Sequence, residues 1–323
     1  MRTVATALGE VPIDQLGRTL THEHLFINLM AERRGDGLLH DEELLIDELQ
    51  VLADQGGQTI FDLTASELTV GSTPDSDRDF TAAPGQTRNP RAVEGIQRIS
   101  RATGVNVVLG AGRYRDPYLR EEIVAELGVE GIAAEMIRDL TEGIPGTTAR
   151  AGLIGEIGAD KWYVSETEAA LFRGAAAAHA ATGAVVYTHA ARWHVGLEQV
   201  ELLVGAGVAP EKIVVGHVDT VPTADFAARV AATGAYVGID TINTANPREV
   251  RRRIDQILDL VRLGYLERIL VAHDVCTVSQ LAAYGGNGFG FVLGDFRTAL
   301  IAAGLDAAEF EEIVVGNPRR LLS

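Results

Sequence analysis

The sequence predicts a (β/α)8 TIM barrel with a short N-terminal strand extension, formed by residues 1–323 as a single domain. Eight short runs rich in Val, Ile and Leu recur along the chain, as expected of parallel strands that are buried on both faces. Longer stretches with apolar residues at helical spacing separate these runs. The chain has 323 residues, of which 46% are apolar and 23% charged, and this is enough for one such barrel with a substantial core.

The predicted elements alternate in the order that a barrel requires. We expect strands at 19–25, 59–64, 106–112, 152–158, 184–190, 213–218, 236–240 and 269–275. We expect helices at 41–54, 169–181, 197–204, 224–232, 247–263 and 291–303, and Ser165 with Glu168 forms a capping box before the second of these. The alternative, a doubly wound open sheet, would carry a glycine-rich phosphate loop after its first strand. Thr-His-Glu-His stands there instead, which favours the barrel.

Two long loops interrupt this alternation, at 65–89 and 276–290. Both follow predicted strands, and loops at the carboxyl ends of barrel strands set specificity in this fold. We therefore expect them to shape a substrate pocket; the alternative is that they are surface excursions without a function.

Composition argues against several classes of protein. The formal net charge of −17 repels phosphate backbones, so we expect no nucleic-acid partner. No apolar run is long enough to span a membrane, and the first residues lack the apolar stretch of a secretory signal. The only cysteine, Cys276, excludes a disulfide within this chain and a multi-cysteine zinc site. These features predict a cytoplasmic protein that does not bind membranes.

A histidine pair lies on the first predicted strand. Side chains alternate between the two faces of a strand, so His22 and His24 point the same way and Glu23 points the opposite way. Two imidazoles directed into a barrel are costly to bury without a partner. A shared metal ion is the simplest partner.

Further polar side chains lie near the carboxyl ends of predicted strands, where barrel enzymes place their chemistry. They are Glu156 on the fourth strand, His189 on the fifth, His217 on the sixth and Asp274 on the eighth. Six imidazole and carboxylate ligands exceed the needs of one catalytic zinc ion, and they suit two divalent cations about 3.5 to 4 Å apart.

The alternative for any single histidine is a satisfied polar residue of the core. We expect such a structural role for His40, in a loop, for His179, in an alanine-rich helix, and for His194. His273 is adjacent to Asp274, so on a regular strand it faces the opposite way.

Five short motifs resemble one known family. They occur in order over nearly the whole chain, which closes with GNPRRLL: THEHL at 21–25, GEIG at 155–158, THA at 188–190, GHVD at 216–219 and AHD at 272–274. Together they resemble the phosphotriesterase-like branch of the amidohydrolase superfamily. The resemblance implies a binuclear metal centre in a (β/α)8 barrel, and it implies a homodimer. By it, His22, His24 and Asp274 hold the more buried metal, and His189 and His217 hold the more exposed one.

The chain departs from the family pattern at the bridging ligand. Many members bridge the metals with a carbamylated lysine on the fourth strand, and Glu156 stands at that position here, whereas Lys161 lies further on in a loop. In this the chain is similar to the phosphotriesterase-homology and phosphotriesterase-related branches, and the departure argues against organophosphate triester hydrolysis. Tyr114 matches a family tyrosine beside the bridging hydroxide; the alternative is a packing aromatic at the barrel mouth.

The predicted function is metal-dependent hydrolysis of a small molecule. Two divalent ions would lower the pKa of a bridging water, and Asp274 would accept a proton. Zinc is expected first, although Mn, Fe, Co or Ni suit the same ligands. The hydroxide would cleave a lactone, a carboxylic ester or a phosphoester. Two alternatives stay open: hydrolysis of a small N-acyl amide, and metal or ligand binding without turnover.

Arg192 and Trp193 follow His189 on the next loop and are candidate substrate contacts. An arginine there could pair with a substrate carboxylate, sulfonate or phosphate. The alternative for Arg192 is a surface ion pair at the rim of the barrel.

Overall fold

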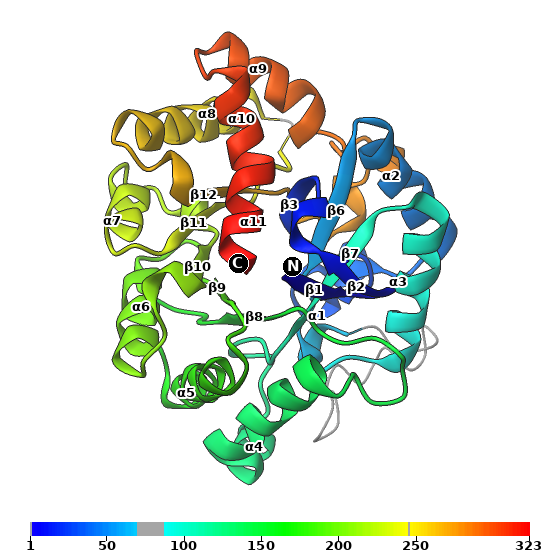
Figure 1. Ribbon diagram of the computed structural model, residues 1–323, viewed down its shortest axis with the longest axis vertical. Helices are drawn as coiled ribbons and strands as arrows, with labels where there is room; N and C mark the ends of the chain where they lie inside the picture. Colours follow the sequence, from blue (N-terminus) through cyan, green and yellow to red (C-terminus); the bar gives the residue numbers. More distant parts are fainter. Residues whose placement is uncertain (1, 70–86, 245) are drawn as a thin grey trace.

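Eight parallel strands form one curved sheet in the computed structural model, which describes residues 2–69, 87–244 and 246–323 (Figure 1). The sheet nearly closes into a barrel where the Asp274 N–H, just after the last strand, donates to the His22 carbonyl on the first at 3.1 Å. Each of the eight predicted runs overlaps one strand, so the predicted barrel is confirmed. The strands, each paired with the next, are β3 (Arg18–Glu23), β6 (Gly57–Asp62), β7 (Asn106–Ala111), β8 (Leu153–Gly158), β9 (Val186–His189), β10 (Ile213–Gly216), β11 (Tyr236–Ile239) and β12 (Ile269–Val271).

Both faces of the strands are buried, which explains why their sequences show continuous apolar runs. On β6, Phe61 clusters with Tyr187 and Tyr236 from other strands of the barrel. Its neighbour Ile60 belongs instead to the core that includes Leu49 of the preceding helix. Adjacent residues of one strand therefore pack into two separate apolar layers.

Helices surround the sheet (Figure 1). Five predicted helices are confirmed with small shifts of their ends: α2 (Glu42–Asp54), α5 (Glu166–Thr182), α6 (Val195–Gly205), α7 (Phe226–Ala232) and α8 (Pro247–Arg262). Two more, α3 (Pro90–Thr103) and α4 (Glu121–Thr141), were not predicted. Within α4, Gly128 has φ 58°, so the helical spacing of apolar residues is interrupted there.

The helix predicted at 291–303 is only partly α-helical. Val292–Phe296 forms a π-helix, and α9 (Arg297–Ala302) continues it. Gly294 lies inside with φ −97° and ψ −107°, outside the α-helical region, and this departure widens the turn. The chain ends with α10 (Ala307–Glu311), a second π-helix at Glu312–Gly316, and α11 (Asn317–Leu322).

An antiparallel hairpin precedes the barrel and confirms the predicted strand extension. Its strands are β1 (Thr3–Thr6) and β2 (Gly9–Pro12). Val4 of this hairpin clusters with Leu321 of α11 and with Phe61 in the barrel. The hairpin and α11 therefore close one end of the barrel.

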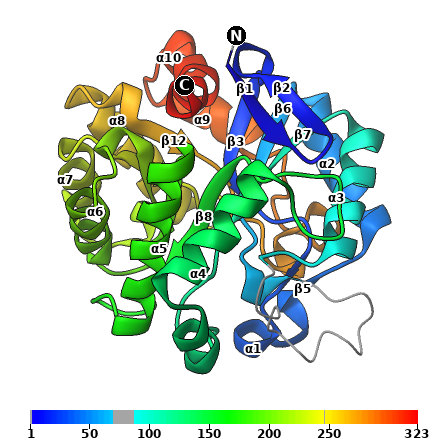
Figure 2. The ribbon, with the colours of Figure 1, turned by 60° about the horizontal axis from the view of Figure 1, so that its bottom comes forward.

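The opposite end of the barrel carries α1 (Met30–Arg33) and the short pair β4 (Ile27–Asn28) and β5 (Leu38–Leu39). Figure 2 shows the two chain termini at one end of the molecule and α1 and β5 at the other. The loop predicted at 276–290 contains two short 3-10 turns, at Val278–Gln280 and Ala282–Tyr284. Most of the loop predicted at 65–89 lies outside the described residues. Within the described ranges, no helix is both long and apolar enough to cross a membrane.

The capping box predicted before α5 is present. Ser165 Oγ accepts a hydrogen bond from the Glu168 N–H at 3.2 Å, and the Glu168 carboxylate accepts one from the Ser165 N–H at 3.0 Å. Ser165→Ala should lower the free energy of unfolding by about 1 kcal/mol, because the Glu168 N–H in the first helical turn loses its acceptor. Urea denaturation followed by circular dichroism measures the loss. Ser165→Thr retains the hydroxyl and is the control; an equal loss in both variants would contradict this role.

Candidate metal centre

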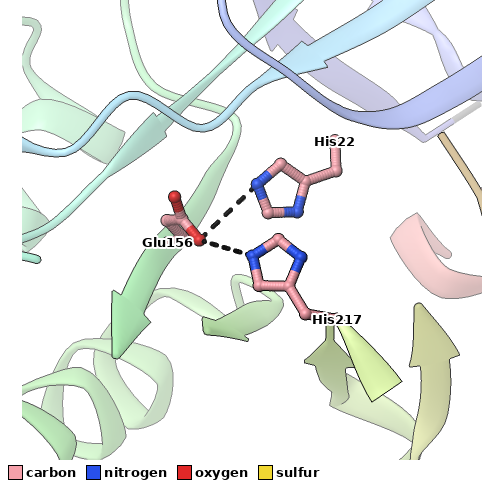
Figure 3. Close-up of side chains that lie close together, drawn as sticks. All are labelled: His22, Glu156 and His217. Atoms are coloured by element: carbon pink, nitrogen blue, oxygen red, sulfur yellow. Dashed lines mark ion pairs between the residues drawn. The ribbon is translucent and has the colours of Figure 1, made fainter. Parts of the chain in front are cut away.

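Glu156, on β8, lies at the middle of the predicted centre. Its Oε2 lies 3.5 Å from His22 Nε2, 3.5 Å from His217 Nε2 and 2.9 Å from His189 Nδ1. Figure 3 shows the carboxylate facing the imidazoles of His22 and His217. One acidic side chain therefore contacts imidazoles that come from three different strand ends.

Asp274 completes the cluster on the side of the first strand. Its Oδ1 lies 3.2 Å from His24 Nε2 and 3.8 Å from His22 Nε2, and Glu156 Oε1 lies 3.7 Å from His24 Nε2. The six predicted ligands thus converge. Two overlapping groups could each hold a metal ion, because their candidate ligand atoms lie within 4.8 Å of one another: His22, Glu156 and His217, and His22, His24 and Asp274.

Asp240, at the end of β11, orients two of these imidazoles and was not predicted from the sequence. Its Oδ2 accepts from His22 Nδ1 at 3.1 Å, and its Oδ1 accepts from His217 Nδ1 at 2.9 Å. The Tyr187 hydroxyl also donates to Oδ2, at 2.8 Å. A Cβ at Gly238 would lie 2.5 Å from Oδ2, so only glycine leaves room for this carboxylate. Both imidazoles consequently present Nε2 to the centre.

His24 is oriented by a different side chain. Its Nδ1 lies 3.0 Å from Thr64 Oγ1, just after β6, and this contact leaves Nε2 facing Asp274 and Glu156. Thr64 was not predicted either. Side-chain partners of this kind fix the tautomer and the orientation of a metal-binding imidazole.

Glu23 and His273 lie side by side on the face opposite to His22, as their strand positions predict. Glu23 Oε1 accepts from His273 Nδ1 at 2.7 Å and from its N–H at 2.8 Å, and Oε2 accepts from the Val275 N–H at 3.1 Å. His273 Nε2 in turn accepts from the Val292 N–H at 2.9 Å. Glu23 thus binds the backbone on both sides of Asp274 and positions that residue.

Two residues of the centre have unusual backbone conformations. His217 has φ 58° and Asp274 has φ 54°, in the left-handed region that residues other than glycine rarely adopt. Such conformations persist only where the surroundings hold them. Asp240 Oδ1 accepts from the His217 N–H at 2.8 Å, and the Asp274 N–H donates to His22, so both are held.

The charges of the cluster attract cations. Burial acts to lower the pKa of His22, but the carboxylates of Glu156 and Asp240 raise it to about 10. Burial acts to raise the pKa of Glu156, but His22 and His189 hold it well below its ordinary value. Burial lowers the pKa of His189 to about 4. Ionised carboxylates shielded from water need positive charge nearby, and either imidazolium protons or metal ions can supply it.

The donor set fits a metal ion. His22 Nε2 is fully buried, and it has no hydrogen-bond partner among the described residues. Such an orphaned nitrogen is costly unless something else binds it. Imidazole and carboxylate donors without a thiolate suit zinc and the neighbouring first-row metals.

Tyr114 lies beside this cluster. Its hydroxyl is 3.4 Å from His189 Nδ1, and the ring is buried. Burial raises the pKa of Tyr114 well above its ordinary value, so the phenol keeps its proton and can donate a hydrogen bond.

A cavity of about 660 Å³ opens over the cluster. His24, Glu156 and Asp274 lie in its wall, together with the predicted contacts Arg192 and Trp193, which are both exposed. Arg192 has φ 70°, and its N–H donates to Thr220 Oγ1 at 2.6 Å. The two residues thus lie on the wall of the cavity that contains the candidate metal ligands.

The remaining histidines lie apart from this cavity. The core role expected of His40 and His194 is wrong, because both are exposed. His179 Nδ1 donates to the Ala184 carbonyl at 2.7 Å, and His194 Nε2 lies 2.7 Å from Thr223 Oγ1. His40 is exposed next to the start of α2. Their roles in the described structure are local.

The sequence was compared with known proteins. A profile of the phosphotriesterase family matches residues 2–72 and 85–322. The chain belongs to the phosphotriesterase family. Its membership confirms the resemblance read from the five motifs, and as a member of this family the chain is a hydrolytic enzyme. The family is metal-dependent, and the cluster described above could bind metal.

Relatives of this phosphotriesterase-family chain differ in what they are named for. It is 30% identical to the phosphotriesterase homology protein of Escherichia coli K12 over 94% of the chain and 97% of that protein. It is 28% identical to the N-acetyltaurine hydrolase of Danio rerio over 99% of the chain and 97% of that protein.

Two solved structures have the same barrel. One is the Escherichia coli phosphotriesterase homology protein with phosphate in its active site (TM-score 0.84, 30% identity, covering 95% of this chain and 99% of that one). The other is a lactonase of Listeria monocytogenes (TM-score 0.85, 26% identity, covering 100% of this chain and 99% of that one).

Asp240→Asn tests the orienting role of this carboxylate. An amide can accept through only one atom, so either His22 or His217 loses its acceptor, and the free energy of unfolding of the metal-free protein should fall by about 1–3 kcal/mol. Zinc affinity should fall about ten- to hundredfold. Denaturation and competition with a chelator measure the two effects. Asp255→Asn, on the exposed face of α8, is the control; unchanged zinc affinity in Asp240→Asn would contradict the role.

Proposed function

We propose that this chain is a binuclear metal-dependent hydrolase that cleaves a lactone, a carboxylic ester or a phosphoester in a small molecule. The observation that carries the proposal is the position of Glu156, whose Oε2 lies near His22, His189 and His217 and whose Oε1 lies near His24. A carboxylate in this position has the two oxygens that a ligand shared between two cations needs.

The cluster divides into two ligand sets. His22, His24 and Asp274 would hold one cation, His189 and His217 the other, and Glu156 would contact both. Zinc fits these donors, and Mn, Fe, Co and Ni fit them as well. When bound, two such cations would lower the pKa of water and polarise the oxygen of the scissile group.

Two side chains in the cavity wall have positions from which they can act on the substrate. Asp274 is the more accessible carboxylate, since 18% of its side chain is exposed against 2% for Glu156. It can therefore take up a proton and pass it to the leaving group or to solvent. The protonated Tyr114 hydroxyl, beside His189, can donate a hydrogen bond to an oxygen that becomes negative.

Cations in the cavity wall can bind an anionic group of the substrate, although carboxylates such as Glu32 and Asp36 lie in the same wall. Arg115 lies there but is paired with Glu32 and Asp160. In the part of the chain that the structure describes, no ion pair involves the other wall cations, which are Arg33, Lys161 and Arg192. Unpaired cations facing one cavity would attract a carboxylate, sulfonate or phosphate group.

The same wall supports a second candidate, hydrolysis of a small N-acyl amide that bears an acidic group. The similarity to N-acetyltaurine hydrolase favours this candidate. The unpaired cations are compatible with it, since they would suit an acidic amide as well as an acidic ester. A barrel that binds metal without turnover is the third possibility. The homodimer, the cytoplasmic location and the lack of a nucleic-acid partner stay predictions.

Metal analysis of Glu156→Ala tests the shared ligand. The zinc-loaded wild type should contain about two equivalents per chain, and the variant should retain one or fewer because both ligand sets lose a donor. Inductively coupled plasma mass spectrometry measures the content. Glu130→Ala, exposed on α4, should retain both ions. Two tightly held ions in Glu156→Ala would overturn the bridging role.

A substrate panel on the same proteins separates the three functions. It contains lactones, aryl esters, phosphotriesters and N-acyl amino acids. Turnover of a lactone, an aryl ester or a phosphotriester supports the ester proposal, and turnover of an N-acyl amino acid supports the amide candidate. A metal-loaded protein that turns over none of them supports a barrel that binds metal without catalysis. Any activity should fall at least about hundredfold in Glu156→Ala.

Arg192→Ala tests anion recognition. Loss of a hydrogen-bonded charge pair should raise KM about ten- to hundredfold for an anionic substrate, with little change for a neutral analogue. Steady-state kinetics on a matched acid and its methyl ester measure the difference. Arg251→Ala, an exposed residue paired with Asp255 on α8, is the control. Equal effects on the acid and the ester would exclude an anion-binding role for Arg192.

A further inference from the structure

Three exposed aromatic residues gather beside the mouth of the cavity. Trp162 and Tyr163 follow β8, and Trp193 follows β9. The ring centroids of Trp162 and Trp193 are 5.7 Å apart with an edge-to-face arrangement, and those of Trp162 and Tyr163 are 5.6 Å apart. Trp162 is 66% exposed, and both Tyr163 and Trp193 are 41% exposed. These rings contact one another edge to face, while much of their apolar surface faces solvent.

This cluster is continuous with the cavity over the metal centre. Trp193 lies in the cavity wall, and so do Lys161 and Arg192, the neighbours in sequence of Trp162 and Trp193. The indole pair therefore lies next to the unpaired cations that would bind an anionic group. Its place at this mouth favours contact with the molecule that enters the cavity.

Both loops that carry the indoles are held in place. The buried Glu168 carboxylate accepts from the Asp160 N–H at 2.8 Å and from the Ser165 N–H at 3.0 Å, on either side of Trp162. The Val164 N–H donates to Glu198 Oε2 at 3.3 Å. On the second loop, the Arg192 N–H is bound to Thr220. Because the backbone of both loops is held in this way, the loops lose little freedom when a ligand packs on the rings that they carry.

We propose that Trp162 and Trp193 form an apolar subsite that binds a hydrocarbon or aromatic part of the substrate. The subsite rests on the proposed function, since it assigns the substrate both an acidic group and an apolar group of several carbons. Exposed aromatic rings bury a large apolar area on binding. Contact of such a ring with a planar or alkyl group is more favourable in free energy than its contact with water. In this role Trp162 and Trp193 determine which substituent of the substrate is accepted. They take no part in bond cleavage.

Intrinsic fluorescence gives a direct test, because Trp162 and Trp193 are the only tryptophans in the chain. Zinc-loaded protein is titrated with 4-phenylbutyrate and with acetate, which share a carboxylate and differ in the apolar tail. We expect 4-phenylbutyrate to change the tryptophan emission saturably and to bind at least about tenfold more tightly than acetate in calorimetry. Equal affinities, or binding without a change in emission, would overturn the proposal.

Variants locate the effect. In Trp162→Ala and in Trp193→Ala the difference between the two ligands should shrink to about threefold or less, with acetate affinity changed by less than about twofold. Leu263→Ala, an exposed apolar residue after α8, should keep the full difference. Circular dichroism confirms that each variant is folded. An undiminished difference in both tryptophan variants would overturn the subsite.

Light scattering addresses the competing role of the cluster as a contact between copies. A lower mass in the tryptophan variants, together with unchanged ligand preference, would assign the cluster to an interface and overturn the subsite. Failure of the hydrolase proposal is distinguishable, because ligand binding is measured without turnover. A protein that binds 4-phenylbutyrate through its indoles but hydrolyses nothing retains the subsite and loses the proposed activity.

Discussion

The arrangement of side chains at the barrel mouth depends on the contact of Glu156 with the imidazoles around it. A carboxylate buried at this depth is costly unless its charge is compensated, and three imidazoles lie within 3.5 Å of its Oε2. Asp240 approaches two of the same rings from behind. Because the His22 and His217 rings each lie between two carboxylates, their orientation is fixed before any cation arrives. The surrounding strands shield the carboxylates of Glu156 and Asp240 from water and hold them in position.

The sequence allowed the barrel and the ligands to be predicted because both depend on local patterns. Strands buried on both faces leave continuous apolar runs, and the polar residues that end those runs lie at one end of the barrel. Asp240 also ends a predicted strand, but its partners lie 218 and 23 residues away, and no local pattern marks the pairing. The same holds for Thr64, which orients His24 across 40 residues.

The errors in the helices have a different origin. The π-helix at Val292–Phe296 depends on the departure of Gly294 from helical geometry, which apolar spacing does not reveal. In α4, Gly128 interrupts the periodicity on which the prediction relied, although α3 begins with an Asn89 cap and Pro90 that could have been recognised. Backbone irregularity, rather than weak apolar content, therefore hid the π-helix and α4.

Glu23 links the closure of the barrel to the placement of a candidate metal ligand. This residue of the first strand accepts backbone hydrogen bonds from His273 and Val275, across about 250 positions of the chain, and the residue enclosed between them is Asp274. Asp274 reaches its place only when the beginning and the end of the polypeptide have met. Capture of a cation by the complete ligand set consequently depends on this contact between the first strand and the end of the last, and a chain that has not closed its ring lacks a full site.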